Sequence, residues 1–195
     1  MDGDTERRTT MTRTLPLAAF LLGLTVTTIA PRTATAGDAS VESLKRAQKL
    51  TARVTEAAAT IRLRASSLDT LARQTSATRE SHAAHLEEIR DVVNGQLRSA
   101  LTELDRMRPG LPAFKQEGIT QMVTAARKLA IETDGALRVK LVDPRVTPAL
   151  IDEYRQRVNR LLANADHLLR TSDTMADFSD AYLRAATLNI PGITG

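Results

Sequence analysis

Two histidines and a glutamate are the residues of this chain best spaced to bind a metal ion. His82 and His85 are three positions apart, and Glu88 follows three positions later. On a helix this spacing places the three side chains on neighbouring positions of one face, where imidazole and carboxylate groups can share a cation. A zinc site needs three or four ligands, and the third histidine, His167, is far away in the sequence. The simplest interpretation is therefore a polar helix start, with a metal site as the alternative.

The sequence lacks the motifs of most other cofactors and of nucleophilic catalysis. A di-iron bundle uses glutamate three positions before histidine on two helices, and no histidine here has that neighbour. The chain has no cysteine, which excludes thiol catalysis and the Cys-x-x-Cys-His attachment of haem. It also has no Gly-x-Ser-x-Gly elbow and no glycine-rich phosphate loop. We expect no enzyme and no cofactor, with haem held by His167 and a methionine as a weaker alternative.

Long amphipathic helices must position these side chains, because apolar residues return every three or four positions and no strand-like alternation occurs. The first inward stripe combines two seven-residue series, Ala47, Val54, Ile61, Leu68 and Leu44, Thr51, Ala58, Ala65, Ala72. The second comprises Leu86, Ile89, Val93, Leu97, Ala100, Leu104 and Met107. The third comprises Ile119, Met122, Ala126, Leu129, Thr133 and Ala136. The fourth comprises Ile151, Tyr154, Val158, Leu161, Ala165, Leu168, Met175 and Tyr182.

The punctuation between these stripes predicts an all-α, up-down-up-down four-helix bundle. Proline and glycine at 108–112 and prolines at 143–148 separate the later helices, and Thr147 is a suitable N-cap before Pro148. The first boundary rests on the polar run from Thr75 to Ser81, because Ser and Thr favour caps. Without a turn there, the alternative is one very long helix with two others folded along it. Asn94-Gly95 interrupts the second helix.

Charge provides a check on this topology. Basic residues crowd the start of the first helix, namely Lys45, Arg46, Lys49 and Arg53. Acidic residues form a stripe on the last helix, namely Asp166, Asp173, Asp177 and Asp180. Because Arg170 lies among them and calcium sites draw ligands from bent loops, we interpret the stripe as a solvated face. In the predicted bundle the basic group lies at the same level as Asp173, Asp177 and Asp180, so we expect these opposite charges to meet.

The first 36 residues have the three parts of a cleavable export signal. Positive charge comes first, an uncharged segment follows from Leu15 to Ala30, and Ala34-Thr35-Ala36 places small residues before the predicted cut. The apolar run is shorter than a membrane-spanning helix of about 20 residues. We expect a signal peptide at 1–36, a bundle at 37–187 and an uncharged tail at 188–195. Met11 is an equally suitable start, and a lipid anchor is excluded because no cysteine follows the cut.

Composition argues against nucleic acid as the partner. Residues 37–195 contain 23 basic and 20 acidic side chains, a net charge of +3, with no block of like charge. Binding of bases also uses aromatic platforms. Only four aromatic residues follow residue 36, namely Phe114, Tyr154, Phe178 and Tyr182.

The stretch from Ser81 to Ile89, Ser-His-Ala-Ala-His-Leu-Glu-Glu-Ile, followed by Val93-Asn94, resembles a group of uncharacterised exported helical proteins of soil bacteria. The resemblance extends into the Ile119 and Tyr154 regions. It implies a helical fold and export, and it implies no activity.

These observations together favour an exported, non-enzymatic helical bundle that acts through protein–protein contacts, as an adaptor, a chaperone-like binder or a sensor module. The alternative is a metal- or haem-binding bundle. We expect an unidentified protein partner, with a homo-oligomer as one possibility, no nucleic acid, and no membrane attachment after signal cleavage. The expected location is the periplasm or the medium.

Overall fold

The computed structural model describes residues 41–74, 78–142 and 148–187. The predicted signal peptide, the domain boundary at 37, the tail at 188–195 and the Thr147 cap lie outside this range. The elements, in order, are α1 (Val41–Arg73), α2 (Arg79–Val92), the π-helical turn η2 (Val93–Leu97), α3 (Arg98–Met107), the 3-10 turn η3 (Arg108–Gly110), α4 (Ala113–Val142) and α5 (Pro148–Thr187). No strand occurs among the described residues.

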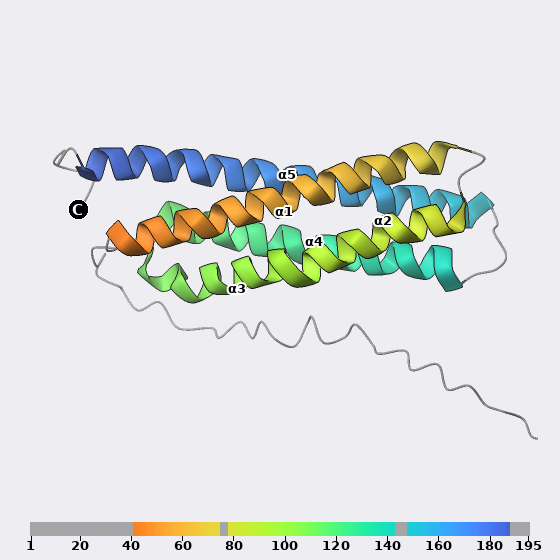
Figure 1. Ribbon diagram of the computed structural model, residues 1–195, viewed down its shortest axis with the longest axis horizontal. Helices are drawn as coiled ribbons and strands as arrows, with labels where there is room; N and C mark the ends of the chain where they lie inside the picture. Colours follow the sequence, from red (N-terminus) through yellow and green to blue (C-terminus); the bar gives the residue numbers. More distant parts are fainter. Residues whose placement is uncertain (1–40, 75–77, 143–147, 188–195) are drawn as a thin grey trace, which may run out of the picture. The chain divides into compact units, whose positions relative to one another are not determined.

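The helices form an up-down-up-down four-helix bundle in which α2, η2 and α3 make one continuous rod (Figure 1). The first helix, α1, packs against α5 and against the α2–α3 rod, and α4 packs against the same two neighbours. The predicted all-α bundle is thus confirmed. The alternative of one very long helix is wrong, because α1 ends at Arg73 and α2 begins at Arg79 and runs in the opposite direction.

Local capping explains the break between the first two helices. The Thr78 hydroxyl accepts a hydrogen bond from the backbone N–H of Ser81 at 3.2 Å, which satisfies a donor in the first turn of α2. At the end of α1, the guanidinium of Arg155 donates two hydrogen bonds of 3.2 Å to the carbonyl of Ala72. A cap from within the polar run and a cap from α5 therefore fix this boundary.

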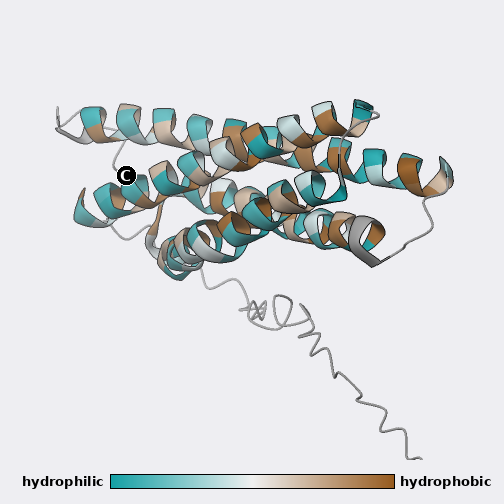
Figure 2. Ribbon diagram, turned by 45° about the vertical axis from the view of Figure 1, so that its right-hand side comes forward, coloured by the Kyte–Doolittle hydropathy of each residue, from teal (hydrophilic) through white to brown (hydrophobic). Residues whose placement is uncertain are grey.

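The predicted apolar stripes form the core. Most of their members are buried, and the four that are only half-buried lie near helix ends, namely Ala72, Met107, Ile151 and Tyr182. Figure 2 shows hydrophobic and hydrophilic bands alternating along every helix. Alanines on α1 such as Ala57 and Ala58 have no exposed surface, which indicates close helix packing. Among the described helices, none is long and apolar enough to cross a membrane.

The Asn94-Gly95 interruption takes the form of the π-helical turn Val93–Leu97 within the second rod. Ile89, Val93 and Leu97 follow one another at intervals of four, and all three are buried. Because a π turn closes with i→i+5 hydrogen bonds and holds more residues than an α turn, it keeps residues at this spacing on one face. The stripe of inward-facing apolar residues therefore continues through the interruption.

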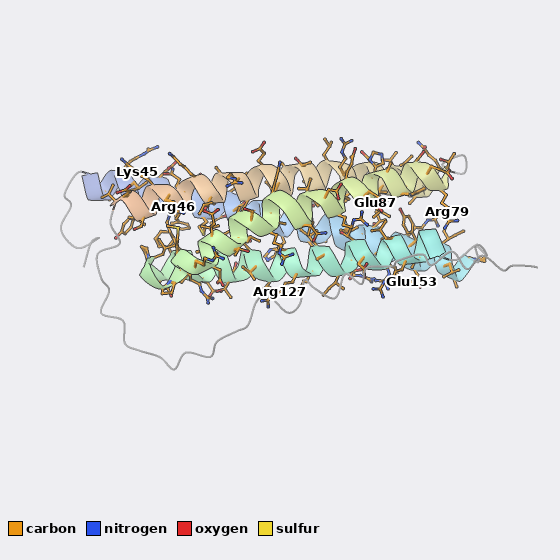
Figure 3. The ribbon with its side chains drawn as sticks, turned by 60° about the horizontal axis from the view of Figure 1, so that its bottom comes forward. Lys45, Arg46, Arg79, Glu87, Arg127 and Glu153 are labelled. Carbon is orange, nitrogen blue, oxygen red and sulfur yellow. The ribbon has the colours of Figure 1, made fainter. Side chains whose placement is uncertain are left out.

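The expected meeting of the two charged groups is half correct. The start of α1 and the end of α5 do lie at the same end of the bundle, where the Gln48 amide donates a hydrogen bond to the Asp180 carboxylate. Arg46, however, forms an ion pair with Glu103 of α3 at 3.4 Å. Within the described residues, no ion pair joins the basic group of α1 to the acidic stripe of α5. Figure 3 shows Lys45 and Arg46 at this end, and Arg79 and Glu153 toward the other.

Candidate functional site

His82, the first of the metal candidates, is a core residue. Its side chain is only 3 % exposed, and its Nδ1 lies 2.8 Å from the hydroxyl oxygen of Tyr154, which is itself 1 % exposed. The two rings meet edge to face, with centroids 5.3 Å apart. Burial raises the pKa of Tyr154 well above its usual value, so the phenol stays neutral. The helix does start where the polar residues predicted, but His82 itself lies in the core.

His85 and Glu88 lie on the flank of α2, away from this buried pair. The His85 side chain is 25 % exposed, its Nδ1 has no hydrogen-bond partner among the described residues, and it lies 3.9 Å from Glu88. The Glu88 carboxylate is engaged by Arg64 of α1 at 2.6 Å. Across the described ranges, no group of three His, Cys, Asp or Glu is arranged to hold a metal ion.

The haem alternative has no better support from geometry. His167 is exposed, whereas Met122 and Met175 are buried. A histidine and a methionine that ligate one haem from within a bundle must both face its interior. Metal or haem binding stays a prediction, which elemental analysis and an absorbance spectrum of the purified protein would test.

The opposite end of the bundle buries a lysine that the sequence analysis missed. Lys115, in the first turn of α4, has no exposed surface, and its Nζ makes no hydrogen bond to any described residue. Its position is on the core stripe, four residues after Leu111 and four before Ile119, both of which are buried. The signal was thus present in the spacing, but a lysine is not counted as apolar in such a pattern.

The electrostatics of Lys115 follow from this position. Burial lowers its pKa from the usual 10.5 to about 8, because the charged ammonium loses its hydration, and the negative charge of Asp180 opposes part of this shift. Lys115 is therefore a buried amine without a hydrogen bond to the described residues.

An aromatic cluster lies on the outside of the same end. The ring of Phe114 is 6.0 Å from that of Phe178 and 6.0 Å from that of Tyr182. The whole chain has three phenylalanines, two tyrosines and no tryptophan, so most of its aromatic side chains meet here. Phe178 is 59 % exposed. Exposed aromatic side chains of this kind are the residues most enriched in protein interfaces.

A surface groove runs between α4 and α5 beside this cluster. It has a volume of about 330 Å³. Its lining comprises Phe114, Glu117, Gly118, Gln121, Arg170, Thr171, Thr174, Met175 and Phe178. Apolar groups from Phe114, Met175 and Phe178 stand beside charged and hydroxyl groups, an arrangement that suits an amphipathic protein surface.

Gly118 allows the two helices to approach at the groove. A Cβ atom at this position would lie 2.7 Å from Sδ of Met175, closer than such atoms approach one another in proteins. Met175 is 3 % exposed, so its side chain closes the floor of the groove against the core. Sequence reasoning missed the groove, because it depends on a contact between residues more than fifty positions apart.

The walls of the groove carry opposite charges. Glu117 on α4 and Arg170 on α5 are both exposed, and neither makes an ion pair with any described residue. Glu117 only accepts a hydrogen bond of 2.9 Å from the Gln121 amide. Elsewhere on the same helix pair, Glu132 of α4 holds both Arg157 and Arg160 of α5, at 3.4 and 2.9 Å.

A comparison with protein-family models, with curated proteins and with solved structures finds no match to this chain. The resemblance described for the Ser81–Asn94 stretch therefore stays a prediction. The groove and the buried side chains must be interpreted from their own chemistry.

Proposed function

We propose that this chain is an exported, non-enzymatic helical bundle that acts through protein–protein contacts, with the groove between α4 and α5 as its contact surface. The roles that this includes are an adaptor, a chaperone-like binder and a sensor module. Its place of action is the periplasm or the medium, as the three-part pattern of residues 1–36 predicts.

The observation that carries the proposal is the aromatic groove. In a chain with so few aromatic side chains, Phe114, Phe178 and Tyr182 gather at one place, and the most exposed of them borders a hollow. Burying a phenylalanine side chain that is now exposed contributes about 1.5–3 kcal/mol to binding. Two side chains capable of acid–base chemistry, His82 and Lys115, lie inside the core.

Affinity capture with matched variants tests the contact surface. The purified protein would capture partners from the envelope fraction of its host, beside a Phe178→Asp variant and a Leu63→Asp variant. Leu63 on α1 is 63 % exposed and lies outside the groove, so it controls for the loss of an exposed apolar side chain. We expect Phe178→Asp to lose the captured proteins and Leu63→Asp to keep them. Equal capture by both variants would contradict the assignment of the surface.

Export has its own test. Fractionation of the host cells, followed by determination of the N-terminal residue, should find the protein outside the cytoplasm with Gly37 at its start. A cytoplasmic protein that retains its first 36 residues would remove the export half of the proposal and leave the contact surface to be judged on its own.

A further inference from the structure

We infer that the groove between α4 and α5 is the interface of a symmetric dimer, so that its partner is a second copy of this chain. The inference rests on the proposed function, because it names the partner of the same surface. Three side chains on that surface carry it: Glu117, Arg170 and Phe178.

The charges of the groove surface are complementary to one another under a two-fold rotation. In a two-fold interface a residue i meets residue j of the second copy, and j meets i. Glu117 and Arg170 are exposed, have opposite charges, lie on opposite walls of the groove and have no ion-pair partner among the described residues. A second copy turned by a two-fold axis provides both partners at once, and two intermolecular ion pairs form.

Phe178 lies close to the two-fold axis that these charges define. A two-fold axis that exchanges the positions of Glu117 and Arg170 lies in the plane of the interface. It crosses the line between these two residues at its midpoint and at right angles. Phe114 and Phe178 are in contact and set the level of the two helices. With a rise of about 1.5 Å per residue and helix axes about 9 Å apart, this two-fold axis crosses α5 within roughly one turn of Phe178.

The two features therefore agree on one arrangement. The axis placed by the charges brings the two Phe178 rings together, and these rings are the most exposed aromatic groups of the described bundle. Stacked aromatic side chains at the centre, with ion pairs at the margin, form the usual anatomy of a specific interface. A partner with a different sequence is not related to this chain by symmetry. The agreement between the charged pair and Phe178 on one two-fold axis therefore favours a second copy of this chain.

Charge reversal tests the pairing directly. The dimer dissociation constant of the full chain would be measured by sedimentation equilibrium for Glu117→Arg, for Arg170→Glu and for the double variant. Each single reversal replaces two attractive pairs with two repulsive ones, so we expect dimerisation to weaken about tenfold or more. The double variant restores both pairs and should dimerise like the unaltered chain. Lys49→Glu, an exposed reversal on α1, is the control and should change nothing.

Mixing provides the most specific result. A Glu117→Arg chain presents only positive charge at these positions, and an Arg170→Glu chain presents only negative charge. Each should be monomeric alone, and an equimolar mixture should form a heterodimer through two Arg–Glu pairs. Circular dichroism and thermal unfolding of each variant would establish that all are folded.

Two results overturn the dimer. One is a monomeric unaltered chain across the measured range, and the other is a dimer whose dissociation constant ignores both single reversals. The proposed function has a separate outcome. If the unaltered chain is monomeric but Phe178→Asp loses a captured protein that Leu63→Asp keeps, the groove binds a different protein, and only the dimer is refuted.

Discussion

The two ends of the bundle solve the same structural problem in different ways. At each end a polar side chain lies on the core stripe, and α4 approaches α5 across a glycine. At the His82 end, the imidazole meets Tyr154, and Gly135 makes room for the Arg157 guanidinium, which binds Glu132 and Glu153. These contacts join His82 to Tyr154 and Arg157 to two carboxylates, whereas Nδ1 of His85 at the same end has no hydrogen bond to a described residue.

The Lys115 end leaves several side chains without such contacts. Among the described residues, Nζ of Lys115 has no hydrogen bond and Glu117 and Arg170 have no ion pair, and Phe178 is exposed. Gly118 makes room for Met175 rather than for an ion pair. The two ends therefore differ in where their charges and aromatic rings lie: at the His82 end the charges of α4 and α5 pair with each other, and at the Lys115 end exposed groups remain that a partner can contact.

The largest expected effect comes from replacing the buried lysine. The folded-state pKa of Lys115, about 8, is below its unfolded value of 10.5, so folding disfavours the charged form. Below pH 8 both states are protonated and the folded state bears the full cost, about 3 kcal/mol. We therefore expect Lys115→Met to be more stable than the unaltered chain by about this amount at pH 7.

The pH dependence gives this prediction its sign. Between pH 8 and 10.5 the unfolded state of the unaltered chain binds more protons, so its free energy of unfolding rises with pH, and above 10.5 both states are neutral. The advantage of Lys115→Met should consequently shrink across this window. Urea unfolding of both proteins at several pH values measures it. A difference in free energy of unfolding between the two proteins that stays constant from pH 7 to 10.5 would contradict the burial of Lys115 in the core.

The second-largest effect concerns the His82 end of the bundle. Tyr154→Phe removes the hydroxyl that His82 contacts and leaves a buried nitrogen without that partner, which costs about 1–3 kcal/mol. Tyr182→Phe is the matched control, because Tyr182 is half-buried and has no hydrogen bond within the described residues. Thermal and urea unfolding of the two variants should separate them. Equal stabilities would mean that the His82–Tyr154 contact contributes nothing to the folded state.

A smaller effect compares the two close approaches of α4 and α5. Gly118→Ala must displace Met175, and Gly135→Ala must displace the guanidinium of Arg157. Relative to Gly95→Ala, each should lose about 1–2 kcal/mol. The loss at Gly135 includes the ion pair with Glu132, so it should decrease at high salt, and the loss at Gly118 should not. Identical salt dependence would remove this distinction between the ends.

Gly95→Ala gives the smallest expected change and serves as the reference. An added Cβ has no atom within 4 Å, and the residue lies in the second rod between the two ends. Alanine reduces the conformational freedom of the unfolded chain, so we expect a gain of about 0.5–1 kcal/mol. A loss of stability in urea unfolding would indicate that the π turn requires glycine.

Periodicity predicted the helices and their inward faces well, because burial of an apolar stripe is a local property of the sequence. Ala47, Val54, Ile61 and Leu68 follow one another at intervals of seven, and none has exposed surface. The same spacing marks His82, four positions before Leu86, and Lys115, four before Ile119, as core residues. Their polarity concealed this, because a pattern of apolar residues does not register a polar one that the fold buries.

Pairings across the bundle were less predictable. The common level of the charged ends of α1 and α5 followed from topology alone. The pairing of Arg46 with Glu103 depends instead on how far the two side chains extend between α1 and α3. The groove depends on Gly118 meeting Met175, and no local feature of either residue announces the other. Sequence reasoning therefore predicted the scaffold, and the candidate site emerged only from contacts between distant segments.

The π turn at Val93–Leu97 has a consequence for how this protein can change over evolutionary time. A π turn is equivalent to an α-helix that carries one inserted residue, with the surplus absorbed locally. Deleting Gly95 would convert the rod to a continuous α-helix while leaving Ile89 on one side and Leu104 on the other directed inward. The rod formed by α2, η2 and α3 can thus vary in length by one residue without changing which of its faces contact α1 and α4.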